Sequence, residues 1–212
     1  MDGSSDPIGV ELVYDPRTEP VKLSDQLVSS GMAQRQSTKA AVASSLADAA
    51  PVRGAQIHSG VLPKGIFKGI ISDSTGPGDF YIQVMTQENA INLGTLTQNL
   101  NSTYGNAGPS HFRPTVGGAC AAPDKASGEW NRAVAEDYAS QDTVVVRFVD
   151  YGNAEEVTLA NVHKLEDRFI EGMPTLAVNC ALAGVTPTGC EWSKDAMTIM
   201  KKVSHYLYFY HY

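Results

Sequence analysis

Side chains that could catalyse a reaction or hold a metal ion are few in this sequence, and they are widely spaced. The five histidines and three cysteines show neither the ligand spacing of a zinc site nor the pairing of a Cys–His nucleophile. Asp73 and Asp79 are the acidic residues of the strand-like segment 65–85, which has no arginine to bind a phosphate, so nuclease chemistry is not expected. The sequence therefore predicts a protein without catalytic residues, bound metal or cofactor.

Charge gives the clearest indication of the kind of ligand. The 212 residues include 16 Lys and Arg against 23 Asp and Glu, a net charge of −7, and residues 117–168 hold five basic and ten acidic side chains. Such a surface attracts a cationic peptide, whereas binding to a phosphate backbone depends on Lys and Arg that displace counterions. A cationic partner is therefore favoured over nucleic acid, although the same charges are also consistent with a merely solvated acidic face.

Cysteine usage and the N-terminal sequence bear on the compartment. The three cysteines are an odd number without close pairing, which favours a reducing, intracellular environment over a disulfide framework. Residues 1–7 have neither the basic nor the apolar part of a signal peptide. We also expect no membrane span, because no apolar run approaches the ~18–20 residues that a transmembrane helix needs.

Short strands are the elements expected to position any binding residues. Four of them follow one another closely, at residues 118–122, 129–136, 143–150 and 155–159. A set this small suits a closed barrel, in which closure removes exposed strand edges. Before it, residues 65–85 predict a hairpin.

A long helix is expected between the hairpin and the barrel. Thr86 can cap its start and Gly105 can end it. The apolar residues expected on its buried face are Ile91, Leu96, Leu100 and Tyr104.

The two ends of the chain predict further elements. Val10–Tyr14 reads as a strand, followed by a helix with Ser24 as N-cap, and the Ala-, Ser- and Gln-rich residues 33–59 read as a tether. Residues 206–212 form an aromatic strand that would be an aggregation hazard if uncovered. We therefore expect either that the chain is truncated there or that another segment pairs with this strand.

Three ordered motifs carry a family resemblance. They are W-x-R-A at Trp130–Ala133, F-V-D-Y-G-N at Phe148–Asn153 and P-x-x-A-x-x-C-x-L at Pro174–Leu182. Together they strongly resemble an extended Tudor domain, in which a Tudor barrel is inserted into a staphylococcal-nuclease-like OB fold. The implied fold is mainly β with helices (α+β), with a small five-stranded Tudor barrel and an OB-fold subdomain joined by a long helix.

The resemblance also implies how the chain is divided. Residues 60–212 resemble one extended Tudor domain, truncated at its C-terminus, with the Tudor core at about 115–169. Residues 1–33 resemble the closing strand and helix of a preceding repeat, and residues 34–59 would be a flexible linker. The chain is thus expected to be a fragment of a multi-Tudor protein in which residues 9–33 complete the OB fold, in cis or in trans.

The function implied by the resemblance is a non-catalytic one. Extended Tudor domains bind arginine-rich peptide tails of PIWI-family proteins, methylated or unmethylated, as scaffolds of the piRNA pathway of RNA-mediated gene silencing. This implies a cytoplasmic location in germline ribonucleoprotein granules (nuage), with other Tudor-family scaffold proteins as further partners. The alternative is a scaffold whose aromatic cage is vestigial and whose protein partners bind other surfaces.

The family's aromatic cage is only half built in this sequence. By position, Phe148 and Tyr151 supply rings and Asn153 the amide, whereas Asn131 replaces the ring expected after the tryptophan and Pro123–Lys125 lacks the ring expected in the preceding loop. Polar groups are then expected to bond arginine N–H groups, with weak preference for dimethylarginine. The expected peptide-binding residues are Phe148, Tyr151, Asn153, Asn131, Asp150 and Asp124.

Overall fold

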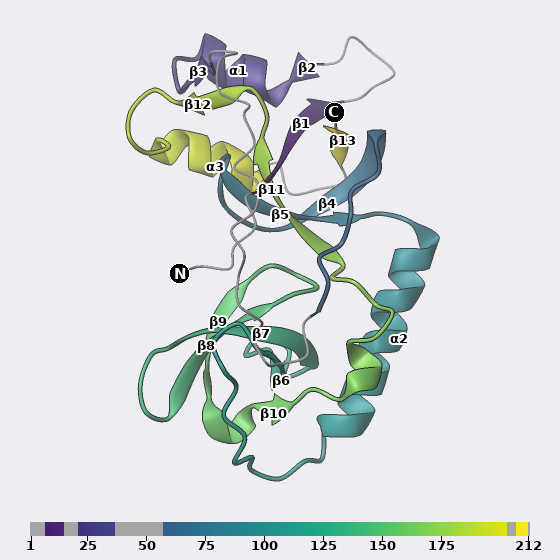
Figure 1. The fold of residues 1–212 in the computed structure, drawn as a ribbon. Coiled ribbons are helices and arrows are strands. Elements are labelled where there is room, and N and C mark those ends of the chain that lie inside the picture. Colours follow the sequence, from purple (N-terminus) through teal and green to yellow (C-terminus); the bar gives the residue numbers. More distant parts are fainter. Residues whose placement is uncertain (1–6, 15–20, 37–56, 203–206, 212) are drawn as a thin grey trace, which may run out of the picture. The chain divides into compact units, whose positions relative to one another are not determined.

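The structure is a computed structural model that describes residues 7–14, 21–36, 57–202 and 207–211. The chain divides into two compact units (Figure 1). The described residues of Arg53–Val61 and Gln83–Val178 form the barrel unit, and those of Asp6–Val52, Leu62–Ile82 and Asn179–Tyr212 form the sheet unit. Most of the expected linker, 34–59, lies outside the described residues. Among the described helices, none is long and apolar enough to cross a membrane.

The barrel unit is built from an antiparallel sheet with strand order β10-β6-β7-β8-β9. Its elements are α2 (Gln87–Tyr104), β6 (Ala119–Pro123), β7 (Trp130–Tyr138), β8 (Thr143–Phe148), β9 (Ala154–Thr158), η1 (Leu159–Asn161, a 3-10 helix), β10 (His163–Lys164) and η2 (Asp167–Phe169, a 3-10 helix). The predicted small five-stranded barrel is thus confirmed.

Alternation along the strands builds the barrel core. On β8 the side chains of Val144, Val146 and Phe148 are buried, while the residues between them are more exposed. Opposite them on β7, Ala133 pairs with Phe148 and Ala135 pairs with Val146. Small side chains facing large ones let a narrow barrel fill its interior without voids.

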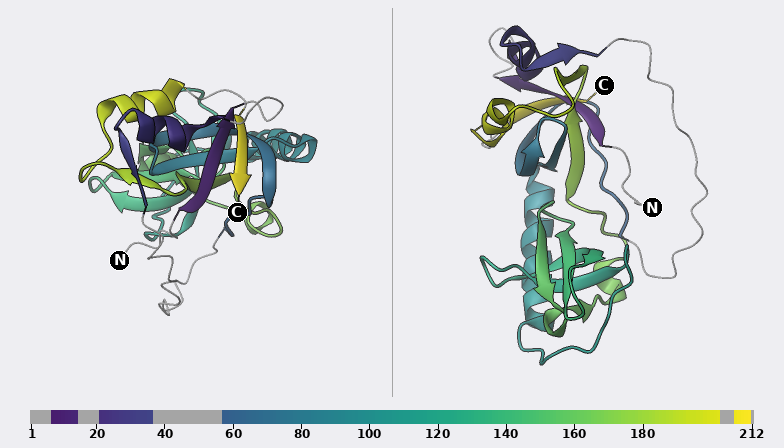
Figure 2. Two further views of the ribbon diagram at one scale, coloured as in Figure 1. Left: turned by 90° about the horizontal axis from the view of Figure 1, so that it is seen from above. Right: turned by 90° about the vertical axis from the view of Figure 1, so that its left-hand side faces the viewer.

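Helix α2 lies along one side of the barrel (Figure 2). It begins after Thr86, whose hydroxyl accepts a hydrogen bond from the backbone N–H of Asn89 at 3.0 Å, as a capping residue does. The ring of Tyr104 stacks on Trp130 with centroids 5.4 Å apart, so Trp130 belongs to the packing between helix and barrel. Ile91, expected on the buried face, is 58% exposed, and that part of the prediction was wrong.

The sheet unit contains a six-stranded sheet in the order β11-β5-β4-β13-β1-β2, in which β11 also pairs with β1. This extra pairing closes the sheet on itself, as in an OB fold. A second sheet joins β12 to β3. The elements are β1 (Ile8–Tyr14), β2 (Val21–Lys22), α1 (Leu23–Ser29), β3 (Ala33–Arg35), β4 (Gly65–Gly76), β5 (Asp79–Val84), β11 (Ala177–Leu182), β12 (Val185–Pro187), α3 (Lys194–Lys202) and β13 (Leu207–His211).

The N-terminal segment supplies part of this closed sheet. Strand β1 runs antiparallel to β13, from Val10 opposite His211 to Val13 opposite Tyr208, and parallel to β11. Strand β13 also pairs with β4 on its other side. The aromatic strand at the C-terminal end is therefore covered on both edges, and residues of the same chain provide one of its partners.

Ser24 has a different role from the one predicted. Helix α1 begins at Leu23, and the Ser24 hydroxyl donates a hydrogen bond to Glu11 Oε2 at 2.7 Å, while its backbone N–H donates to Glu11 Oε1 at 3.3 Å. Glu11 is only 2% exposed. Lys22 occupies the N-cap position, so Ser24 lies inside the helix, and its hydroxyl supplies a donor that the buried carboxylate needs.

Candidate functional site

A buried ion pair fixes the turn at the end of β8. Arg132 on β7 donates to both carboxylate oxygens of Asp150, from Nε at 2.9 Å and from Nη2 at 2.6 Å. Its remaining N–H groups donate to the backbone carbonyls of Phe169, Met173 and Pro174 at 2.8–2.9 Å. All five donors of the guanidinium are thus used inside the protein.

The side chain of Asp150 is consequently buried and bonded to groups of the protein itself. Its side chain is 2% exposed, and Oδ1 also accepts a hydrogen bond from the backbone N–H of Leu176 at 3.0 Å. Both carboxylate oxygens are occupied by groups of the protein itself. The structure thus directs the Asp150 side chain to Arg132 inside the protein and not to an exposed surface, where a peptide contact was expected.

The turn between β8 and β9 presents Tyr151 and Asn153. The carbonyl of Phe148 accepts hydrogen bonds from the backbone N–H groups of Tyr151 at 3.1 Å and Gly152 at 2.7 Å, and the N–H of Phe148 donates to the Asn153 carbonyl at 2.9 Å. Gly152 has φ +97°, a conformation that side-chain-bearing residues rarely adopt. This tight closure holds Tyr151 and Asn153 half-buried at one end of the barrel.

Replacing Gly152 by alanine should lower the free energy of unfolding by about 1–2 kcal/mol, because a Cβ is strained at this positive φ. Urea denaturation followed by circular dichroism measures the loss. Gly94→Ala is the matched control: Gly94 lies within α2 with open space around its Cα, so alanine there should stabilise by about 0.5–1 kcal/mol. Equal effects of the two substitutions would contradict the strain argument.

The loop between β6 and β7 is closed by the carboxylate of Asp124. Its Oδ1 accepts hydrogen bonds from the backbone N–H groups of Ala126 at 3.0 Å and Ser127 at 2.7 Å and from the Ser127 hydroxyl at 2.8 Å. Partial burial works against ionisation of Asp124, but these hydrogen bonds outweigh it and lower the pKa of this carboxyl. Asp124 is therefore a fixed negative charge at the tip of the loop.

The loop and the turn meet through Glu155 at the start of β9. Its Oε2 accepts a hydrogen bond from the backbone N–H of Lys125 at 3.1 Å, and its Oε1 accepts one from Asn153 Nδ2 at 3.4 Å. We call the side chains around this junction the mouth. It consists of Asp124, Asn153 and Glu155, with Tyr151 of the same turn and Glu129, whose backbone carbonyl accepts a hydrogen bond from the Asp124 N–H at 2.9 Å.

Tyr151 is the aromatic ring of the mouth. Burial raises the pKa of its phenol, a hydrogen bond with the Thr97 side chain opposes this, and the negative charges of Asp150, Glu129 and Asp124 raise it further. The phenol therefore stays neutral at physiological pH. A neutral ring surrounded by negative charge is a favourable surface for an organic cation.

Phe148 and Asn131 are both largely buried, in different surroundings. Phe148 is 1% exposed and packs in the barrel core, so it offers no exposed ring face. Asn131 is 6% exposed, and its Nδ2 donates to the Glu129 carbonyl at 3.0 Å. Of the two cage rings expected, only Tyr151 reaches the mouth.

Three residues of the site were not singled out from the sequence. Glu155 and Glu129 were counted only as members of an acidic surface, and Thr97 only as part of a helix. Glu155 opens the expected strand 155–159, two residues after Asn153 of the preceding turn, and this closeness in sequence was the available signal. Nothing in the sequence indicated that Thr97 of α2 would reach Tyr151.

The side chains of the mouth are acidic, amide and aromatic groups, whose chemistry suits a cation. The described residues contain no group of three or more His, Cys, Asp or Glu side chains arranged to hold a metal ion. What the mouth offers is one ring, one amide and three carboxylates. A planar guanidinium can stack on the ring and donate its N–H groups to the oxygens around it.

A five-stranded barrel with a long helix beside it and an OB-like closed sheet define the fold class of the extended Tudor domains. A sequence model of the Tudor domain matches residues 62–184, more than half of the chain. The protein therefore belongs to the Tudor domain family.

Known relatives agree with this membership. The chain is 33% identical to mouse Tudor domain-containing protein 1 over 138 residues, which cover 65% of this chain and 12% of that protein. The extended Tudor domain of human TDRD1, solved in complex with a symmetrically dimethylated peptide, is 31% identical with a TM-score of 0.65, and the match covers 71% of this chain and 74% of that one.

A third likeness is to the Papi extended Tudor domain of Drosophila melanogaster, solved in complex with a Piwi N-terminal peptide. It is 25% identical with a TM-score of 0.57, and the match covers 66% of this chain and 70% of that one. The family and fold are those of peptide-binding modules. Because the chain spans only 12% of the mouse relative, the activity and partners of a whole protein do not follow from the match.

Proposed function

We propose that this protein is a non-catalytic module that binds an arginine of a peptide at the mouth. The observation that carries the proposal is the half-buried ring of Tyr151 in a turn that Glu155 joins to the acidic loop of Asp124, through hydrogen bonds from Asn153 Nδ2 and the Lys125 N–H. The negative charges of Asp124 and Glu129 act on the same phenol. The complexes of the human and Drosophila relatives with arginine-containing peptides support it. Asn153, already donating to Glu155, completes the polar wall of the site.

The chemistry of the guanidinium fits these groups better than that of an ammonium. A guanidinium is planar and weakly hydrated, so it stacks on an aromatic face and still presents N–H groups at its edge. Carboxylate oxygens accept such N–H groups in strong, charge-assisted hydrogen bonds. A lysine ammonium is a compact, strongly hydrated charge and gains less from a single ring.

The natural ligand that we propose is the arginine-rich tail of a PIWI-family protein, with this module serving as a scaffold of the piRNA pathway in cytoplasmic germline granules. Support comes from the Piwi peptide bound to the Drosophila relative and from the acidic surface of the barrel unit. Other Tudor-family scaffold proteins are proposed as further partners. Imaging of the tagged full-length protein in germ cells, with a PIWI protein as marker, tests the location.

Calorimetric titration with an arginine peptide and with the same peptide carrying lysine tests the binding. The arginine peptide should bind more tightly, and Tyr151→Ala and Glu155→Gln should each weaken it about tenfold, since each removes a ring or a charge worth about 1–2 kcal/mol. The matched control is Asp142→Asn, which removes one negative charge at the opposite end of β8.

The control separates the mouth from the general field of the acidic surface. Asp142→Asn should change the affinity less than twofold if the mouth is the site. Equal losses for Glu155→Gln and Asp142→Asn would mean that only the overall charge attracts the peptide. No binding of either peptide would favour the alternative, a scaffold whose partners bind other surfaces.

A further inference from the structure

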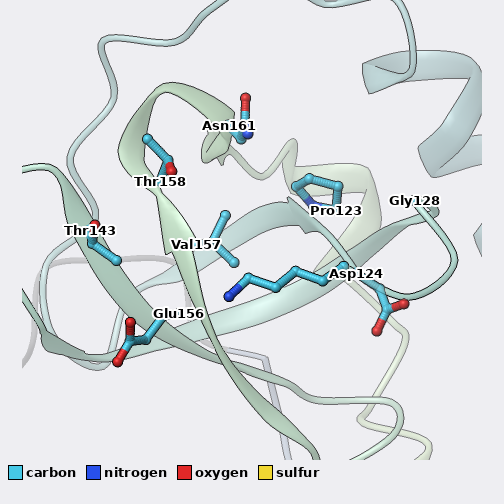
Figure 3. A pocket seen from close by; sticks show the side chains of 9 residues that line it. Pro123, Asp124, Gly128, Thr143, Glu156, Val157, Thr158 and Asn161 are labelled. Atoms are coloured by element: carbon cyan, nitrogen blue, oxygen red, sulfur yellow. The ribbon is translucent and has the colours of Figure 1, made fainter.

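The barrel has an open hollow beside the mouth, between β9 and β6. Strand β9 is an edge strand, and no strand among the described residues pairs with its outer side. The hollow has a volume of about 500 Å³ and is lined by residues of β9, the end of β6 and the loop that follows it. Figure 3 shows Pro123 across this hollow from Val157 and Thr158 of β9.

The hydrogen-bond register shows which backbone groups of β9 face the hollow. The N–H of Phe148 donates to the Asn153 carbonyl, and the N–H of Leu159 donates to the Asp142 carbonyl, so odd-numbered residues of this stretch bond to β8. In an antiparallel pair, the residues between them point their N–H and C=O groups the other way. Those of Glu156 and Thr158 therefore point to the outer side of β9, and both residues line the hollow.

Pro123 explains why β6 does not close this gap. The N–H of Asp124, the residue after β6, donates to the carbonyl of Glu129 on the side of β7. The preceding residue, Pro123, therefore turns its backbone groups toward the outer side of β6. Proline has no N–H, and it cannot donate to a ladder. The hollow is thus bordered by backbone donors and acceptors on β9 and by a position without a donor on β6.

We propose that this hollow binds the main chain of the peptide next to the arginine held at the mouth, as an extended strand added to β9. The inference rests on the proposed function. Asp124 belongs to both the mouth and the lining of the hollow, and the loop between them is bonded to β9 through the N–H of Lys125 and Glu155. The mouth and the hollow therefore share residues of this loop.

The chemistry of the hollow fits a peptide main chain. An added strand presents alternating N–H and C=O groups, which match the outward-facing groups of Glu156 and Thr158. The charged side chains of the lining are of both signs, Lys125 against Asp124 and Glu156, so the hollow does not select an anion. Affinity would come from the backbone, and the arginine at the mouth would set the register.

Amide hydrogen exchange of the whole protein, followed by NMR with and without saturating arginine peptide, tests the inference. The amides of Glu156 and Thr158 should exchange at least about tenfold more slowly in the complex, because they gain partners. Val157, whose N–H already bonds within the barrel sheet, is the internal control and should change little. Bound peptide with unchanged exchange at Glu156 and Thr158 would overturn the strand addition and leave arginine binding intact.

A second measurement uses two peptides, each with a backbone N-methyl group on one of two adjacent residues beside the arginine. Only one of these residues can turn its N–H toward β9, so one peptide should bind about three- to tenfold more weakly and the other less than twofold. Asn161→Trp, which fills the hollow, should abolish this difference, whereas Ala139→Trp, at an exposed position just beyond the far end of β7, should preserve it. Equal affinities of the two peptides for the wild-type protein would overturn the proposal, and no binding of the unmodified peptide would overturn the proposed function with it.

Discussion

Replacing Arg132 by methionine is expected to lower the free energy of unfolding by about 3–5 kcal/mol, the usual cost of leaving one charge of a buried pair alone. Arg132 is 0% exposed, and its partner Asp150 would remain buried without a counter-charge. The carbonyls of Phe169 and Met173 would also lose their donor. Because whole domains are stable by only about 5–15 kcal/mol, this single change would remove a large part of the total.

Arg168→Met is the matched control for this prediction. Arg168 also pairs with a carboxylate, Glu166, but its side chain is 60% exposed. Exposed pairs contribute about 0–1 kcal/mol, so the control should shift the urea midpoint only slightly. A loss below about 1 kcal/mol for Arg132→Met would show that the pair does not hold the turn as described.

Symmetric dimethylation of the bound arginine is expected to weaken binding about five- to thirtyfold, in contrast to the gain expected from a complete aromatic cage. Methylation removes two of the five N–H donors of the guanidinium. If one of these donors bonds a carboxylate in the unmethylated complex, its loss costs about 1.5–3 kcal/mol, whereas one ring returns about 0.5–1 kcal/mol, so the net loss is about 1–2 kcal/mol. Because Tyr151 is the one expected cage ring at the mouth, and the mouth also holds the carboxylates of Asp124, Glu129 and Glu155, the loss exceeds the gain.

Titrations with matched unmethylated, monomethylated and symmetrically dimethylated peptides measure this order of affinities. Lys125→Phe supplies the comparison, because Lys125 is exposed in the loop where the sequence lacks a ring. An added ring should recover about two- to fivefold for the dimethylated peptide. Tighter binding of the dimethylated peptide by the wild-type protein would contradict the prediction.

The strands and the long helix could be predicted because their signals are local. Apolar alternation marks β8, and Thr86 followed by an apolar helical face marks α2. Ser24 shows where local signals fail. Its residue type is common at helix N-caps, but it lies inside the helix, and its hydroxyl donates to Glu11, which is distant in sequence. Likewise, no local pattern could show that Ile91 would be left exposed by its neighbours.

The site residues divide in the same way. Tyr151, Asn153 and Asp124 belong to a loop and a turn that the sequence marks clearly, and the structure brings all three to one end of the barrel. Phe148 and Asp150 lie in the same turn motif, yet the ring of Phe148 faces the core and the carboxylate of Asp150 faces Arg132. Which way each side chain points depends on strand register and on partners from other elements.

The sequence by itself determined the family, the five-stranded barrel, the acidic character of the ligand surface and the shortage of rings for a methylated arginine. Only the tertiary structure decided that Glu129 and Glu155 join the mouth, that Phe148 leaves it, and that β9 keeps an open edge beside Pro123. The physical reason is that composition and spacing fix local backbone preferences and net charge. Burial, ion pairing and unsatisfied strand edges arise only when distant segments meet.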